Sequence, residues 1–155
     1  MAEIPYVPKK YRDAIEKADK LAKLGKHEKA LSILDRVAKE CPDWWAVHYN
    51  RGIELNAVDR WQESVLSLDR ALEIATTAPW GDVLPPVVIS WIHNNRGSSL
   101  TKGFRFALAR EAFEAALAVN PANDFARDNL EVLGDIDRIL LEEQTDLKGG
   151  NRLVH

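Results

Sequence analysis

The sequence predicts an all-α protein in which pairs of helices stack into an array. Apolar residues recur every three or four positions in seven segments, which is the helical period, and short turns separate these segments. The stretches "HYNRGIEL" at 48–55 and "HNNRGSSL" at 93–100 share five of eight letters. A repeat carried on helices predicts that each helix pair buries its apolar face against the next pair.

Each of the seven segments has helix signals of its own. Gly25 ends the first segment and Pro42 the second. The segment 87–102 begins with β-branched residues, which also suit a strand, but Asn94, Asn95 and Arg96 break any strand alternation and favour a helix. The predicted helices cover 9–24, 27–40, about 43–57, about 61–75, 87–102, 106–119 and 124–144.

The repeat has a period of about 34 residues, which suits two helices and their turns. Ala18 lies one period before Gly52, and Gly52 aligns with Gly97. Pro42 follows Ala18 at the same spacing as Pro121 follows Gly97. A glycine inside a helix costs about 1 kcal/mol relative to alanine, so we interpret both glycines as places where a neighbouring helix packs closely. The matching large residues of the second helices are Leu34, Leu68 and Phe113.

This pattern resembles the tetratricopeptide repeat family: a small residue late in the first helix, alanine and a large residue in the second, and a terminal proline. The resemblance implies a right-handed α-solenoid of three helix pairs plus a C-terminal capping helix. We expect one domain over 1–148 and a flexible tail over 149–155. The repeats are placed at about 11–44, 45–78 and 90–123, with the capping helix at about 124–146.

An insertion interrupts the period between the second and third repeats. The spacing from Gly52 to Gly97 exceeds one period by eleven positions, and Thr76 stands where the other repeats have proline. The extra residues are about 79–89, "PWGDVLPPVVI". Insertions in repeat arrays form loops that are often functional. Trp80 either packs back on the array or contacts a partner, and the sequence leaves both open.

Composition excludes several classes of function. A net charge of −3 argues against a nucleic acid or an anionic membrane as partner. Cys41 is the single cysteine, so the chain cannot form an internal disulfide. We expect no signal peptide, because the first ten residues lack an apolar run, and no apolar stretch reaches the roughly 20 residues of a membrane span. A cytoplasmic protein is the expectation.

Catalytic and metal-binding motifs are not found. His48 and His93 lie one repeat apart on successive helices, too far apart for one active site, and we interpret them as packed side chains. The sequence has no H-E-x-x-H, no C-x-x-C and no glycine-rich phosphate loop. We expect no enzyme activity and no cofactor. Arg51 and Arg96 could bind anions or form salt bridges with nearby acids.

The family resemblance places a binding site on the concave side of the array. It implies a scaffold, adaptor or co-chaperone-like module that holds a peptide segment or helix there. Asn50 and Asn95 stand where family members hydrogen-bond a peptide backbone, which suits an amide that both donates and accepts. The implied peptide contacts are Tyr49, Asn50, Ile53, Asn56, Trp91, Asn94, Asn95 and Lys102.

One activity of the family can be compared residue by residue. Co-chaperone members grip a C-terminal carboxylate with two lysines, two asparagines and an arginine. Of the five matching positions here, only Asn50 carries the required residue; the others are Ile15, Asp19, Trp91 and Asn95. The sequence therefore does not predict binding of chaperone tails.

An uneven distribution of charge suggests an alternative function. Residues 1–40 hold ten basic and seven acidic side chains, whereas residues 122–147 hold two basic and eight acidic ones. These end helices either are simply solvated or attract each other between molecules. The alternative is therefore a self-assembly module that forms a homo-oligomer.

Overall fold

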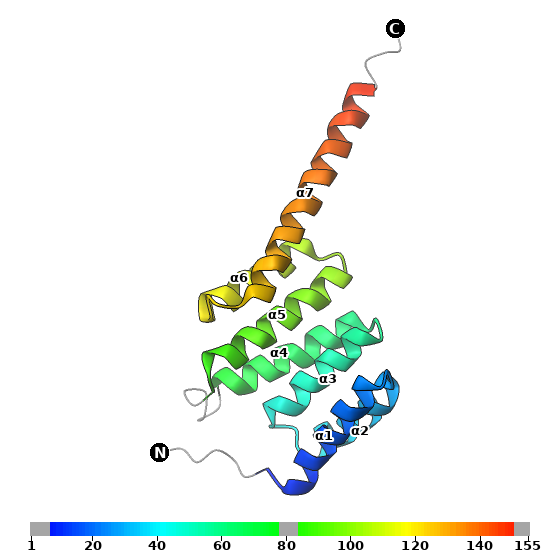
Figure 1. The fold of residues 1–155 in the computed structure, drawn as a ribbon, viewed down its shortest axis with the longest axis vertical. Helices are drawn as coiled ribbons and strands as arrows, with labels where there is room; N and C mark the ends of the chain where they lie inside the picture. Colours follow the sequence, from blue (N-terminus) through cyan, green and yellow to red (C-terminus); the bar gives the residue numbers. More distant parts are fainter. Residues whose placement is uncertain (1–6, 78–83, 151–155) are drawn as a thin grey trace.

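The computed structural model describes residues 7–77 and 84–150, and within these ranges the chain is an all-α solenoid (Figure 1). Its helices run antiparallel in pairs, followed by a long last helix, as the sequence predicts. Trp80 and residues 151–155 of the predicted tail lie outside the described residues. The helices are α1 (Lys9–Lys23), α2 (His27–Glu40), α3 (Trp45–Ala57), α4 (Trp61–Thr77), α5 (Pro86–Lys102), α6 (Phe106–Val119) and α7 (Asp124–Gly150).

Local chemistry explains where several helices begin and end. α4 continues to Thr77 because residue 76 is threonine rather than proline, and the Thr76 hydroxyl donates to the Leu72 carbonyl at 2.8 Å. α5 begins with Pro86, whose missing N–H would be unpaired in a first turn anyway. Asn123 caps α7 by accepting a hydrogen bond from the Ala126 N–H at 3.1 Å. α7 ends at Gly150, four residues beyond the predicted 146.

The first helices of the pairs lie along one side of the array. The backbones of α1 and α3, of α3 and α5, and of α5 and α7 approach one another closely, whereas those of α2, α4 and α6 do not. The array therefore bends toward the odd-numbered helices, which makes their outer surface its concave face. We use the term concave face for the surface formed by α1, α3, α5 and α7.

Three clusters of buried side chains form the core, one after another along the array. The first lies between α1, α2 and the start of α3, the second between α3, α4 and α5, and the third between α5, α6 and α7. Their largest fully buried side chains include Leu34, Leu68 and Phe113, the residues that the repeat aligns. Each helix pair thus packs only on its neighbours, as in other repeat proteins.

The glycines of the repeat allow the two helices of a pair to approach closely. A Cβ added to Gly52 would lie 2.6 Å from Leu68 Cγ, and one added to Gly97 would lie 2.5 Å from Phe113 Cε1. These distances are far below a van der Waals contact, so the packing interpretation of both glycines is confirmed. Ser64 adds a buried polar contact at the same place, because its hydroxyl donates to the Gly52 carbonyl at 2.6 Å.

We predict opposite effects for two alanine substitutions. Gly97→Ala should lower the free energy of unfolding by about 1–3 kcal/mol, because the new methyl group overlaps the Phe113 ring. Gly134→Ala in α7 is the matched control: it has nothing within 4 Å. It should raise the free energy of unfolding by up to about 1 kcal/mol through helix propensity. Urea unfolding followed by circular dichroism measures both, and equal effects would contradict this account of the packing.

Candidate functional site

The predicted peptide contacts come from α3 and α5, which lie side by side in the middle of the concave face. Tyr49 and Asn94 occupy the same position in successive repeats, as do Asn50 and Asn95. All four side chains are half-buried, so part of each remains open to solvent. Neighbouring helices of a regular array present equivalent positions next to one another, which brings these side chains into a short band.

Asn50 and Asn95, two of the three asparagines of this band, already make hydrogen bonds within the protein. Asn50 Nδ2 donates to the Ala46 carbonyl at 2.7 Å. Asn95 Nδ2 donates to Trp91 O at 2.9 Å and to Tyr49 Oη at 3.2 Å, which links α5 to α3. The Asn50 side chain therefore has one N–H and its carbonyl oxygen available to a ligand. Asn95 has only its carbonyl oxygen available, because both of its N–H groups are already bonded.

Three other predicted contacts also join neighbouring helices. Asn94 Oδ1 accepts a hydrogen bond from Asn129 Nδ2 on α7 at 3.1 Å. Lys102 Nζ donates to Asn56 O at 2.6 Å and to Asp59 Oδ1 at 2.7 Å, at the end of α3. Asn56 Oδ1 is buried and has no hydrogen-bond partner among the described residues. A ligand could not reach this oxygen without movement of its surroundings, so Asn56 is poorly placed for direct contact.

The apolar members of the site differ in exposure. Trp91 lies one turn before Asn95 on α5 and is 45% exposed, which makes it the more accessible of the two predicted aromatic contacts. Tyr49 packs beside Trp45 with ring centroids 6.2 Å apart, and its burial raises the pKa of its phenol. Ile53 is half-buried on α3. Trp91 is therefore the side chain best placed to anchor a partner.

Two residues of α7 extend this surface and were missed by the sequence analysis. Asn129 lies one repeat period after Asn95, and Phe125 lies one period after Trp91. Phe125 is 73% exposed. The same period that revealed the repeats would have found both residues if it had been carried past the third repeat. Asparagine thus occupies one repeat position on three successive odd-numbered helices.

Arg51 and Arg96 form salt bridges with the preceding helix pair. Arg51 Nε contacts Asp35 Oδ1 at 2.6 Å, and Arg51 Nη1 donates to the Ser67 hydroxyl at 2.5 Å. Arg96 Nε contacts Asp69 Oδ1 at 2.5 Å. Asp35 and Asp69 also lie one period apart, so one ion pair recurs at successive repeat junctions. Both arginines already have carboxylate partners, which favours the salt-bridge interpretation over anion binding.

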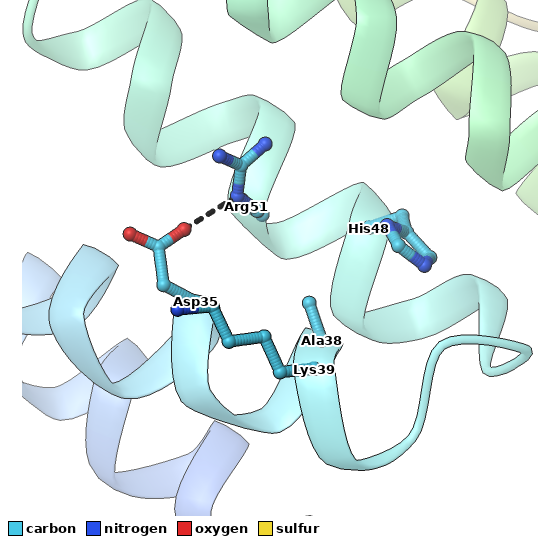
Figure 2. A pocket seen from close by; sticks show the side chains of 5 residues that line it. All are labelled: Asp35, Ala38, Lys39, His48 and Arg51. Atoms are coloured by element: carbon cyan, nitrogen blue, oxygen red, sulfur yellow. Dashed lines mark hydrogen bonds and ion pairs between the residues drawn. The ribbon is translucent and has the colours of Figure 1, made fainter.

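A hollow of about 330 Å³ lies between α2 and α3, away from the predicted peptide contacts (Figure 2). Its lining contains Arg51, turned toward Asp35, and His48, whose Nε2 contacts the Pro42 carbonyl at 2.7 Å. Because Asp35 neutralises Arg51, the positive charge of this hollow comes mainly from Lys39. The lining residues are Asp35, Ala38, Lys39, His48 and Arg51.

The described residues offer no cluster of three or more histidine, cysteine, aspartate or glutamate side chains with the geometry to hold a metal ion.

Burial lowers the pKa values of both His48 and His93 below the usual range for histidine. Nearby arginines lower these two pKa values further: Arg70 and Arg51 lie beside His48, and Arg96 lies beside His93.

Among the described helices, none has the length and apolar character to span a bilayer.

Comparisons with known proteins identify the fold. No family model and no curated protein sequence matches the chain. Among solved structures, the first tetratricopeptide repeat domain of Spaghetti (RPAP3) bound to the HSP90 peptide SRMEEVD superposes with a TM-score of 0.72 at 16% identity, covering 86% of this chain and 98% of that one. The Arabidopsis OM64 domain gives a TM-score of 0.69 at 18% identity, covering 81% of this chain and 94% of that one.

A third structure is the second such domain of human RPAP3 in complex with the HSP70 peptide SGPTIEEVD. It gives a TM-score of 0.67 at 18% identity and covers 78% of this chain and 92% of that one. These likenesses show that the chain has the fold of tetratricopeptide repeat domains.

We predict that the two half-buried histidines make the protein less stable in mild acid. Their pKa values are lowered in the folded state, so the unfolded chain binds more protons as the pH falls through about 6.5. The free energy of unfolding should therefore decrease between pH 7.5 and pH 5.5. His48→Gln with His93→Gln should reduce that decrease in urea titrations at the two pH values. An unchanged decrease would contradict the assignment to these histidines.

Proposed function

Because the chain has the fold of tetratricopeptide repeat domains, we propose that it is a non-catalytic scaffold or adaptor whose concave face binds a peptide segment or helix of another protein. Solenoids of this kind offer an extended surface rather than a reactive centre. The proposed binding surface consists of α3, α5 and the first half of α7, with the predicted contacts Tyr49, Asn50, Ile53, Trp91, Asn94, Asn95 and Lys102. The predicted contact Asn56 would reach a partner only if its surroundings moved.

The repeated asparagine is the observation that carries this proposal. Asn50, Asn95 and Asn129 occupy one position in successive repeats. A bound backbone offers N–H and C=O groups at regular spacing, and an amide side chain can pair with either. Asn50 keeps a donor and an acceptor, and Asn95 keeps an acceptor. Trp91 beside them supplies the exposed aromatic surface that often dominates binding energy at interfaces.

The chemistry of the concave face argues against an acidic tail as the partner. Two of the related structures hold peptides that end in EEVD. At the corresponding positions here, Ile15 is half-buried in the first core cluster, and Asp19 is an acid paired with Lys23 at 2.6 Å. Trp91 and Asn95 carry no charge. An acidic peptide would therefore lack most of its cationic partners, and we propose a segment of neutral or basic character instead.

We predict that removing two of the amides weakens binding of a partner captured by pull-down. Asn50→Ala with Asn95→Ala should raise the Kd about thirtyfold, since two lost hydrogen bonds of about 1 kcal/mol each remove about 2 kcal/mol of binding free energy. Gln62→Ala removes an exposed amide from α4, away from the concave face, and serves as the matched control. Calorimetric titration of the folded variants measures the change. Binding unchanged in the double variant would contradict the site.

Self-assembly is a second candidate function, favoured by the charges of the end helices. α1 carries six basic and three acidic residues, and α7 carries three basic and eight acidic ones. Head-to-tail attraction between α1 of one molecule and α7 of another would form oligomers held by charge.

Such oligomers should dissociate as salt screens the attraction. Light scattering between about 20 mM and 500 mM salt tests this prediction, because the Debye length falls severalfold over that range. A protein that is monomeric at low salt would eliminate this candidate.

A further inference from the structure

α7 carries a line of exposed apolar side chains that the fold does not use. Phe125, Val132 and Ile139 are 73%, 53% and 56% exposed. They are spaced seven residues apart, close to two helical turns, so they lie on one side of the helix along about 21 Å. We call these three residues the α7 stripe. Three large apolar residues aligned at heptad spacing differ from the isolated surface leucines that most proteins have.

The α7 stripe borders the concave face. Asn129 lies one turn after Phe125 and one turn before Val132, and its side chain donates to Asn94 on α5. Phe125 also occupies the repeat position of Trp91, the exposed aromatic of α5. The stripe is therefore continuous with the proposed binding surface and gives it an apolar border on the side of the last helix.

The C-terminal half of α7 extends beyond the other helices of the array (Figure 1). An ion pair between Arg110 and Asp137, 2.5 Å long, joins α7 to α6. All side chains from 138 to 145 are exposed, including Ile139, Leu140 and Leu141. A helix gains most of its stability from packing of an apolar face, and this half of α7 has no such packing within the described residues. A second helix laid along it would supply the missing contacts.

Charge determines which kind of helix fits. Asp128, Asp135, Glu142 and Glu143 each lie one turn from a residue of the α7 stripe, and all four are exposed. Asp135 pairs with Arg138, whereas Asp128, Glu142 and Glu143 take part in none of the ion pairs that α7 forms among the described side chains. The stripe is thus flanked by carboxylates, which attract a cationic partner and repel an acidic one.

These observations lead to a specific occupant: we propose that a basic amphipathic helix of another protein lies along α7, with its apolar side on Phe125, Val132 and Ile139 and its lysines or arginines beside the flanking carboxylates. This inference rests on the proposed function, in which the partner binds as a peptide segment or a helix, and it names a helix as the part of the partner that lies on α7. Recognition of an apolar helix face through residues three, four and seven apart is a common mode of binding.

A second copy of the chain fits this surface less well. Two α7 helices laid together would bring the same carboxylates into contact. α1 is basic, but its apolar residues Ala14, Ala18 and Leu21 already pack in the first core cluster. Neither helix of another copy therefore offers a free apolar face together with basic flanks.

The test uses the full-length protein and a designed 18-residue peptide with leucines on one helical face and lysines elsewhere. Fluorescence anisotropy at 150 mM salt compares three peptides: this one, a scrambled sequence of the same composition, and a version with glutamate in place of lysine. The first peptide should bind at least tenfold more tightly than the other two. Equal binding of the scrambled peptide would overturn the proposal, because charge alone would then explain the affinity.

Substitutions locate the binding. Val132→Ser with Ile139→Ser should weaken binding of the leucine–lysine peptide at least tenfold. Leu24→Ser with Leu66→Ser is the matched control: both leucines are 68% exposed and lie outside α7. Circular dichroism confirms that both double variants remain folded. Equal affinities of the two double variants would overturn the assignment to α7.

Two further measurements separate this inference from its alternatives. A dimer in light scattering that the Val132→Ser and Ile139→Ser variant abolishes would mean that a second copy covers the stripe, and would overturn the proposal. A captured partner that loses binding with the Asn50 and Asn95 variants but not with the α7 variant would contradict this inference while leaving the proposed function intact. The reverse result would support the α7 stripe and contradict the asparagine site.

Discussion

The close approach of two helices at a glycine is the constraint on which the rest of this structure depends. Gly52 lies against Leu68 and Gly97 against Phe113, at distances that leave no room for a Cβ. The approach lets the large side chain fill the space between the helices and lets Ser64 bond the Gly52 carbonyl. Because the same contact recurs, successive pairs stack with similar geometry, and their first helices lie side by side. Equivalent residues of these helices then share one surface, so a single repeat position becomes a column of asparagines.

Much of the helix packing could be predicted from the sequence, because residues one repeat period apart occupy equivalent places in successive helix pairs. The aligned residues Gly52 and Gly97 predicted the close contacts, and the helix boundaries followed from prolines and glycines. Asn129 and Phe125 were missed because repetition was assumed to end with the third pair. Contacts such as Lys102 to the Asn56 carbonyl could not be predicted, since they depend on how neighbouring turns meet. Phe104 is similar: its φ of 56° matches those of Gly25 and Asp59 in the equivalent turns, but a phenylalanine gives no signal for that conformation.

Some charged side chains of the protein form ion pairs with one another, whereas others remain without a charged partner among the described residues. Arg51 and Arg96 use their charge on Asp35 and Asp69, which ties each helix pair to the one before it. Such partly exposed pairs add modestly to stability, but they fix the register between pairs and remove two cations from any ligand site. The part of the concave face between α3 and α5 presents amides beside Trp91, a surface suited to a backbone and an apolar side chain. Two of the related structures hold acidic peptides that end in EEVD, and amides with an uncharged indole offer such a peptide little opposite charge. The shared fold alone therefore does not determine the ligand.

The last helix is packed on the array along its first half and free of it along its second half. Its first half is held by the array through Ala126, Leu133 and the bond from Asn129 to Asn94, and it therefore presents Phe125 and Val132 at a fixed place beside α5. Its second half has exposed leucine and isoleucine side chains and no tertiary contact to stabilise it beyond Asp137 within the described residues. A partner helix bound to the rigid half would be guided along the exposed half, where every added turn buries apolar surface on both molecules. Affinity would then grow with the length of the partner helix. An extended peptide bound only through Asn50 and Asn95 would show no such dependence.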